Sequence, residues 1–297
     1  MAQRGENKAK ARKSPAARPA PAKARRMPDV QASADARRVA IDKVGVKAIT
    51  YPIRLRTRCA RTGEVSEQTT VANVSMYVSL PHTQKGTHMS RFLEVLNQHT
   101  AEPITPDQIP ALTRAICERL NAETAHFQAN FTYFIRKDAP VTGQPGLMDY
   151  EVGFECTANG ETDFVMSVAA PAASLCPCSK EISKYGAHNQ RCRIEAKVRF
   201  TGMLWIEELV ALLEGAASCP VFAVLKRPDE KWVTEHAYEN PKFVEDIVRD
   251  LALALDRDKR ITWYSISSEN YESIHNHNAY AEITRRVARG VARKSRA

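Results

Sequence analysis

Alternating apolar and polar residues predict strands in the first half of the chain, because successive side chains on a strand point to opposite faces. Four stretches alternate in this way: 51–55, 74–80, 127–135 and 148–156. Between the second and third of these, Phe92, Leu93 and Leu96 predict one helix. A second helix is predicted after Thr105-Pro106-Asp107-Gln108, a capping box with proline at the first helical position. The predicted order is therefore strand, strand, helix, helix, strand, strand.

The second half of the chain repeats this order. Strands are predicted at 164–168, 192–200, 261–267 and 280–287, and helices at 205–213 and 243–255. We expect Asn240-Pro241 to cap the last helix. The repetition indicates an α+β protein with two tandem modules of antiparallel sheet, each with a pair of helices packed on one face. Such sheets leave free edges, which favours the assembly of several copies into an oligomer.

Length and charge narrow the class of protein. A chain of 297 residues can bury a large core, and no stretch approaches the roughly 18 apolar residues of a membrane-crossing helix. The first 26 residues carry a net charge of +8 and residues 283–297 carry +6, so the total of +9 leaves −5 on the remainder. An acidic body argues against a specific nucleic-acid groove within the fold, although the basic ends could contact RNA or DNA nonspecifically.

The N-terminal segment is unlike the rest of the chain. It is rich in Ala, Pro, Lys and Arg and has no aromatic residue before Met27. It cannot bury enough apolar surface to offset the entropy of ordering, so we expect a disordered tail over 1–38. Seven cysteines are an odd number and the N-terminus has no apolar signal region, which disfavours a disulfide framework and favours a reducing cytoplasm.

The densest group of chemically capable residues lies between two predicted strands of the second half. Cys176-Pro177-Cys178 is followed by His188, twelve positions after Cys176. A thiolate and an imidazole suit a borderline metal such as zinc, or a Cys/His nucleophile pair. The spacing alone favours the simpler interpretation of a small buried cysteine and a solvent-facing histidine.

Two further groups give weaker signals. In His275-Asn276-His277 the alternation of a strand would send the two imidazoles to opposite faces, so we expect at most one of them in a given site. Residues 226–235 contain the acids Glu230 and Glu235 and are predicted to form a charged loop. By itself this segment indicates no more than an ordinary charged loop at the protein surface.

Residues 81–91 join a predicted strand to a predicted helix. They contain a glycine, several hydroxyl groups and three potential cations, Lys85, His88 and Arg91. Backbone amides at a helix N-terminus together with such cations can cradle a phosphate. Plain helix capping explains the glycine and the hydroxyl groups equally well.

Taken together, several long motifs resemble the type IB GTP cyclohydrolase I family. They run Leu80-Pro-His-Thr-Gln-Lys-Gly-Thr-His-Met-Ser-Arg-Phe92, Cys176-Pro-Cys-Ser-Lys-Glu-Ile-Ser with Tyr185-Gly-Ala-His-Asn-Gln-Arg191, Lys226-Arg-Pro-Asp-Glu230, and Glu239-Asn-Pro-Lys-Phe-Val-Glu245-Asp. The resemblance implies a tunnelling fold with modules at 39–158 and 159–290, between basic tails at 1–38 and 291–297. It also implies a homotetramer with active sites at subunit interfaces.

The family hydrolyses GTP to 7,8-dihydroneopterin 3'-triphosphate and formate, the first step of folate biosynthesis. By motif, Cys176, Glu230 and His275 resemble its metal ligands, and His188 resembles a residue that ligates the metal or exchanges protons beside it. The resemblance implies one divalent metal per active site: zinc, iron or manganese. Glu235 stays open as an alternative to Glu230.

The resemblance also implies how GTP is held. Glu245 resembles the carboxylate that accepts hydrogen bonds from the guanine N1–H and 2-amino group, an edge that adenine does not offer. Lys85, His88 and Arg91 would neutralise the triphosphate from their own or a neighbouring subunit. The role of Cys178 stays open, either as a second thiol near the metal or as a loop residue.

Two other readings compete with this one. A related tunnelling-fold enzyme that reduces a nitrile on a deazaguanine with NADPH would use Cys176 as a covalent nucleophile. A nucleic-acid-binding protein would use the basic tails together with a structural metal. Deletion of residues 1–26 separates the second reading from a cyclohydrolase.

Overall fold

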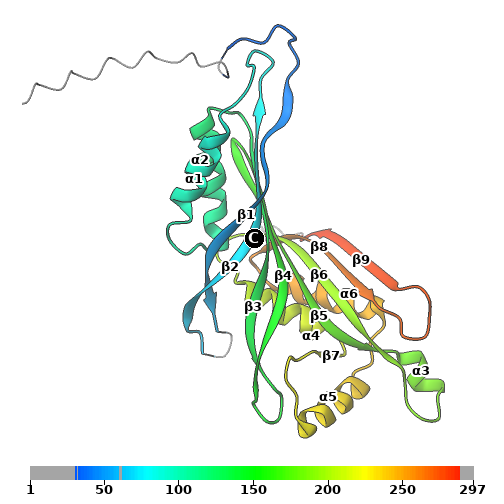
Figure 1. Ribbon diagram of the computed structural model, residues 1–297. Helices are drawn as coiled ribbons and strands as arrows, with labels where there is room; N and C mark the ends of the chain where they lie inside the picture. The colour runs from blue at the N-terminus through cyan, green and yellow to red at the C-terminus, as the bar shows by residue number, and fades with distance from the viewer. Residues whose placement is uncertain (1–30, 32, 60–61, 288–297) are drawn as a thin grey trace, which may run out of the picture.

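The computed structural model describes residues 31, 33–59 and 62–287 (Figure 1). The strands are β1 Ile41–Arg58, β2 Val65–Leu80, β3 Ala125–Asp138, β4 Pro145–Asn159, β5 Glu161–Leu175, β6 Asn189–Phe200, β7 Cys219–Pro220, β8 Ile261–Asn270 and β9 Ala279–Arg286. The helices are α1 Met89–His99, α2 Ile109–Leu120, α3 Pro177–Ile182, α4 Ile206–Ala216, α5 Arg227–Glu239 and α6 Val244–Arg257. In the part of the chain described here, no helix is both long and apolar enough to cross a membrane.

All of these strands belong to one antiparallel sheet. Its order is β1-β2-β3-β4-β5-β6-β8-β9, with β7 added beside β5. The β4–β5 hairpin joins the two halves, so the tandem units predicted from the repeat share one continuous sheet. The basic segments 1–30 and 288–297 lie outside the described residues.

Helices α1, α2, α4 and α6 pack on one face of this sheet, which is the apolar face that the alternation predicted. Figure 1 shows α1 and α2 beside the strands of the first half, and α4 and α6 beside those of the second. Four aromatic rings, Phe131, Phe154, Phe164 and Phe200, form a row of edge-to-face contacts from β3 to β6. This row crosses the junction between the halves, so both helix pairs cover one hydrophobic core.

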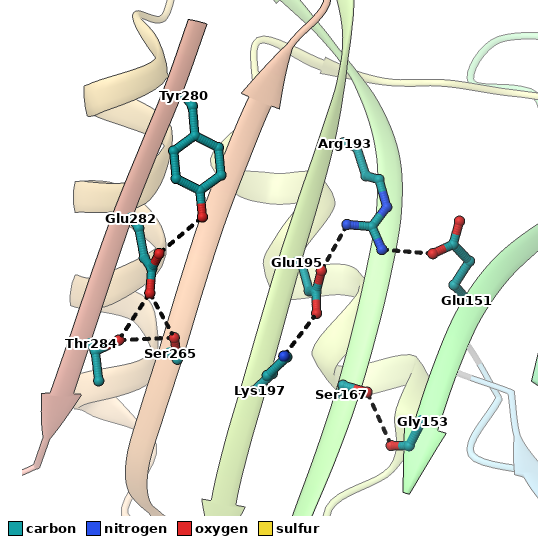
Figure 2. Close-up of polar contacts among 10 residues, drawn as sticks. All are labelled: Glu151, Gly153, Ser167, Arg193, Glu195, Lys197, Ser265, Tyr280, Glu282 and Thr284. Atoms are coloured by element: carbon teal, nitrogen blue, oxygen red, sulfur yellow. Dashed lines mark hydrogen bonds and ion pairs between the residues drawn. The ribbon is translucent and has the colours of Figure 1, made fainter. Parts of the chain in front are cut away.

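The opposite face of the sheet is polar. Figure 2 shows Arg193 of β6 between Glu151 and Glu195, at 2.6 and 2.7 Å, with Lys197 3.8 Å from Glu195. In the neighbouring strands the Ser167 hydroxyl donates to the Gly153 carbonyl. Glycine is required at position 153, because a Cβ there would lie 2.4 Å from the Ser167 oxygen. This polar row explains the alternation of Arg193, Glu195 and Lys197 with buried residues along β6.

Helix α4 connects the two halves through a buried polar seam. The Glu207 carboxylate accepts from the Tyr133 hydroxyl at 2.6 Å and from the Arg58 backbone N–H at 2.7 Å. Glu214, two turns along the same helix, accepts from Lys137 at 2.7 Å and from the Tyr150 hydroxyl at 2.8 Å. Both acids of α4 are thus paired with groups on strands of the first half.

Several local predictions need correction. The capping box at Thr105 is present, but it begins a 3₁₀ turn, and α2 follows from Ile109. Asn240-Pro241 does not cap α6, whose N-cap is Phe243; Asn240 instead ends α5. The strands are longer than the alternating stretches, because strand pairing continues where one face of the sheet is no longer buried.

The segment just before β1 also has partners. An isolated bridge pairs Ala34 with Gln84, and the carbonyl of Ser33 accepts from the Lys85 N–H at 3.0 Å. Residues 31 and 33–38 were assigned to the disordered tail from their composition. Their backbone pairs with the β2–α1 connection, an interaction that composition does not report.

Candidate functional site

Cys176 is held at the end of β5, where the chain turns into α3. It is the N-cap of that helix, and its Sγ accepts from the Ser179 backbone N–H at 3.4 Å. Pro177 follows at the first helical position, where its missing N–H costs no hydrogen bond. The thiol is half-buried, whereas that of Cys178 is exposed. Cys176 is thus fixed to the sheet and still accessible.

His188 lies beside Cys176. The Cys176 backbone N–H donates to the His188 carbonyl at 3.1 Å, and the His188 N–H donates to the Ser179 hydroxyl at 3.2 Å. The half-buried imidazole has its Nδ1 3.1 Å from Gln190 Oε1 and 3.1 Å from Ser273 Oγ. Hydrogen bonds therefore hold the backbone of Cys176 and His188 together, and another ties the imidazole ring to the β8–β9 loop.

That loop, residues 271–278, corrects the prediction for the two histidines. They lie in a bend rather than on a strand, and their rings stack with centroids 5.0 Å apart and planes 17° from parallel. Both imidazoles therefore lie side by side, not on opposite faces. The Tyr271 N–H donates to the Arg191 carbonyl, which anchors the start of the loop beside His188. His275 thus lies on a loop tied to the His188 segment.

Residues 226–235, predicted as a loop, begin helix α5. The buried Asp229 accepts from the Lys226 N–H at 2.9 Å and from Val141 and Thr142 N–H at 2.9 and 2.8 Å. Burial opposes its charge, but these hydrogen bonds and one from the Thr142 hydroxyl hold the pKa of Asp229 well below its usual range. The helix was missed because Lys, Pro, Asp and Glu suggested a charged surface, whereas one of those acids is a buried cap.

The structure separates the two candidate acids on α5. Lys231 contacts both oxygens of the Glu235 carboxylate at 2.6 Å. The Glu230 side chain, in the first turn beside Asp229, is exposed and has no hydrogen-bond or ion-pair partner among the described residues. The two carboxylates therefore differ in their surroundings, since Glu235 forms an exposed ion pair with Lys231 and Glu230 forms none among the described residues.

Glu245 occupies the first turn of α6 and is exposed. The start of this helix is tied to the candidate site, because the Lys242 N–H donates to the Leu175 carbonyl, one residue before Cys176. Asp246, the next residue, accepts from the Phe243 N–H at 3.0 Å and caps the helix. The start of α6 thus fixes the position of Glu245, and the Glu245 carboxylate takes no part in the capping hydrogen bond.

The predicted triphosphate residues lie elsewhere in the chain. They belong to the β2–α1 connection and the first turn of α1, and Figure 1 shows α1 and α3 at opposite ends of the molecule. Lys85 is exposed, and His88 and Arg91 are half-buried. The N–H groups of Lys85 and Gly86 donate to Ser33 and Gln31 carbonyls, so those two amides are not free to cradle a phosphate.

The donor set fits a borderline metal in its chemistry. A half-buried thiol and an imidazole joined by backbone hydrogen bonds, with a second imidazole on an attached loop, are ligands that zinc, iron and manganese accept. Within the described ranges, no three His, Cys, Asp or Glu side chains are close enough together to hold an ion. In the described residues the predicted donors thus lie on separate elements, at the start of α3, on α5 and in the 271–278 loop, and are not gathered around one point.

Sequence reasoning missed the residues that hold this site together. Gln190 and Asp229 lie inside the quoted motifs but were given no role there, and Ser273 lies outside them, because each acts through a contact with a segment distant in sequence. For Gln190 the only possible indication was that it is a buried polar residue near His188. That burial is visible only in the folded chain.

An antiparallel sheet with helix pairs on one face, and its candidate site at the strand ends, defines the class of tunnelling-fold enzymes. Solved structures agree on the fold. A hyperthermostable mutant of Bacillus sp. TB-90 urate oxidase matches with a TM-score of 0.51 and 9% identity, over 83% of this chain and 98% of that one. The uricase of Bacillus fastidious matches with a TM-score of 0.50 and 8% identity, over 83% and 94%.

Sequence relatives define the family. The profile described as type I GTP cyclohydrolase folE2 matches residues 27–281. The GTP cyclohydrolase FolE2 of Magnetococcus marinus is 54% identical over 86% of this chain and 94% of its own. That of Geobacter sulfurreducens is 53% identical over 86% and 97%. The chain belongs to the type I GTP cyclohydrolase family of the FolE2 kind, which confirms the predicted family and fold.

Proposed function

We propose that this protein hydrolyses GTP at C8 of the purine to 7,8-dihydroneopterin 3'-triphosphate and formate, a reaction that supplies folate synthesis. The family assignment supports this activity. The observation that carries it is the joining of Cys176, His188 and the 271–278 loop by the hydrogen bonds around Ser179 and Ser273. A folded chain that binds GTP but forms no formate would contradict it.

Glu245 would hold the base. A carboxylate can accept two hydrogen bonds from the N1–H and 2-amino group of guanine, so it distinguishes guanine from adenine. Its position in the first turn of α6 fits this role, because the positive end of the helix dipole favours a negative charge there. Replacement by an amide would turn one acceptor into a donor facing the 2-amino group.

His188 would move the proton. Ring opening requires a proton on a purine ring nitrogen, and an imidazole can both accept and donate a proton. With Nδ1 occupied by Gln190 and Ser273, its Nε2 is the nitrogen directed to chemistry. Half-burial keeps the ring in one orientation without sealing it from substrate.

We further propose that Cys176, Glu230 and His275, with His188 beside them, hold one divalent metal. Zinc, iron and manganese all suit this donor set, and such a metal supplies Lewis-acid activation of water when bound. Glu230 is preferred to Glu235 because Glu235 already pairs with Lys231. Glu230→Gln should therefore lower zinc content, whereas Glu235→Gln should leave it unchanged.

Two or more copies would complete the site. The β2–α1 connection is at the other end of the molecule from α3 (Figure 1), so Lys85, His88 and Arg91 would serve a neighbour's site. Exposed apolar side chains surround the candidate site, with Ile182 84% and Tyr185 89% exposed. Such side chains are typical of an interface. We propose a homotetramer that works in the reducing cytoplasm, where its seven free cysteines stay reduced.

The activity is tested by metal reconstitution. The protein is stripped with a chelator, reloaded separately with zinc, manganese or ferrous iron, and given GTP. Formate and the fluorescence of oxidised neopterin are then measured together. Equal amounts of both, formed only with metal, support the proposal, and the relative rates rank the metals.

The shared site is tested by mixing variants. Lys85→Ala and Cys176→Ala should each be inactive alone. If the two residues serve one site from different subunits, oligomers assembled from both variants contain some intact sites and recover part of the turnover. If each site is built within one subunit, no mixture recovers activity. Light scattering gives the number of copies.

A further inference from the structure

The Nδ1 atom of His188 lies in a short chain of hydrogen bonds that reaches a carboxylate. Gln190 Nε2 donates to Glu272 Oε1 at 3.2 Å, and Gln190 Oε1 lies 3.1 Å from His188 Nδ1. Gln190 is only 8% exposed, so water does not compete freely for its amide. The order along this chain is Glu272, Gln190, His188.

The chemistry of the three groups fixes the direction of each bond. An ionised carboxylate can only accept, so the amide must turn its NH₂ to Glu272 and its carbonyl to His188. A carbonyl also only accepts, so Nδ1 must carry the proton. The opposite tautomer would place the lone pair of Nδ1 against the lone pairs of the carbonyl. Ser273 Oγ, 3.1 Å from the same nitrogen, can accept as well.

We propose that Gln190 and Glu272 are positioning residues that hold His188 in the tautomer with Nδ1 protonated and Nε2 carrying the free lone pair. Nε2 is then the atom that ligates a metal or exchanges the proton during ring opening; this consequence rests on the proposed function. The pair also fastens the loop that carries His275 to the start of β6, because Glu272 belongs to that loop.

A matched pair elsewhere on the same loop separates the two effects. Asn278 Nδ2 donates to Glu269 Oε1 at 2.7 Å, so it too ties the loop to the sheet, but neither residue has a hydrogen bond to His188 among the described residues. Asn278→Leu therefore loosens the loop without removing the acceptor from Nδ1. Gln190→Leu removes that acceptor and keeps a similar volume.

The first test is nitrogen NMR of the full-length chain with ¹⁵N-labelled histidine, without metal and without GTP. The His188 signal is identified by its absence from His188→Ala. We expect the Nδ1–H form in the wild type and in Asn278→Leu, and loss of that preference in Gln190→Leu. An Nε2–H form in the wild type, or an unchanged tautomer in Gln190→Leu, overturns the proposal.

The second test is a swap. In the double variant Gln190→Glu/Glu272→Gln the new carboxylate can accept from both Nδ1–H and the new amide, so the order of acceptors is restored. Zinc affinity, measured by competition with a chelator, should fall about 10- to 100-fold in Gln190→Leu and return toward wild type in the swap. A correctly folded swap that remains as weak as Gln190→Leu contradicts the proposal. If the tautomer result holds and no formate is formed from GTP, the positioning role stands and the proposed function fails.

Discussion

The two halves of the sheet share one framework but differ in their connections. In the first half, residues 59–64 connect β1 to β2, and a turn between Asp138 and Pro145 connects β3 to β4. In the second half, the corresponding connections hold α3 with Cys176, and the 271–278 loop. Between the paired helices, α1 and α2 are separated by a 3₁₀ turn, whereas β7 and α5 separate α4 from α6.

The difference shows where this fold acquires chemistry. Each lengthened connection of the second half carries a predicted metal-site residue: Cys176 and His188, Glu230, and His275. The strands beneath them alternate and pair as those of the first half do. A rigid sheet can therefore carry reactive groups on its loops without changing its core.

The largest expected effect is the loss of metal and activity when a predicted metal ligand of the second half is replaced. Cys176→Ala and His275→Ala should each lose bound metal and reduce GTP turnover by roughly 10³-fold or more, the scale seen when an essential active-site group is removed. Metal content by mass spectrometry and formate release measure both effects. Cys178→Ala, two residues away and exposed, is the matched control. Near-normal metal and turnover in either variant would refute the assignment.

The next effect should be equal in the two halves. Leu112 of α2 and Leu251 of α6 are 1% and 0% exposed, so Leu→Ala at either position should destabilise the fold by about 2–5 kcal/mol. Because both lie in one core, urea should unfold each variant in a single transition. Leu253→Ala, 55% exposed, should change the free energy of unfolding by less than about 0.5 kcal/mol. Separate transitions for the halves would show that the shared core does not couple them.

A smaller effect probes the seam between the halves. Burial, followed by the neighbouring Glu207 carboxylate, raises the pKa of Tyr133 well above its ordinary value. A raised folded-state pKa means that the tyrosine contributes its stabilisation fully below about pH 10 and loses it as the pH rises further. Tyr133→Phe should cost about 1.5–3 kcal/mol at neutral pH, as for a hydrogen bond to a charged group.

Denaturant titrations from pH 7 to pH 11 measure both parts of this prediction. The variant should lose stability less steeply than the wild type at the alkaline end. Tyr185→Phe, 89% exposed, should stay within about 0.5 kcal/mol of wild type at neutral pH. If the free energy of unfolding falls equally steeply with alkaline pH in Tyr133→Phe and in the wild type, Tyr133 does not cause the pH dependence.

Replacing the predicted guanine-binding residue should have a smaller effect on activity than replacing a predicted metal ligand. Glu245→Gln keeps the helix start and should retain the metal, but KM for GTP should rise about 10-fold, because one good hydrogen bond to a charged group is weakened. Glu235→Gln, on α5 and paired with Lys231, should change neither quantity. Unchanged KM and kcat in Glu245→Gln would remove Glu245 from the base site.

The smallest expected effect comes from the basic N-terminal segment. Deletion of residues 1–26 should leave GTP turnover within about twofold of wild type and reduce salt-dependent RNA binding, since the charge there is nonspecific. A large loss of turnover would give this segment a role in the reaction.

The sequence by itself determined the repeated framework and the family. Alternation along 74–80 or 192–200 is a local property, so it identified strands and their buried faces without any knowledge of their partners. The motifs around Cys176 and His188 were contiguous in the chain, and they marked the segment that the structure places at the candidate site.

Only the tertiary structure decided how the site is held. Glu272 reaches Gln190 across 82 positions, and Asp229 reaches Thr142 across 87, because the folded chain brings those segments together. The folded chain also shows that the charged segment at 227–239 is a helix capped by a buried acid, and that the imidazoles of His275 and His277 stack. Local periodicity cannot report such contacts, since it records which face a residue occupies and not which distant segment lies opposite.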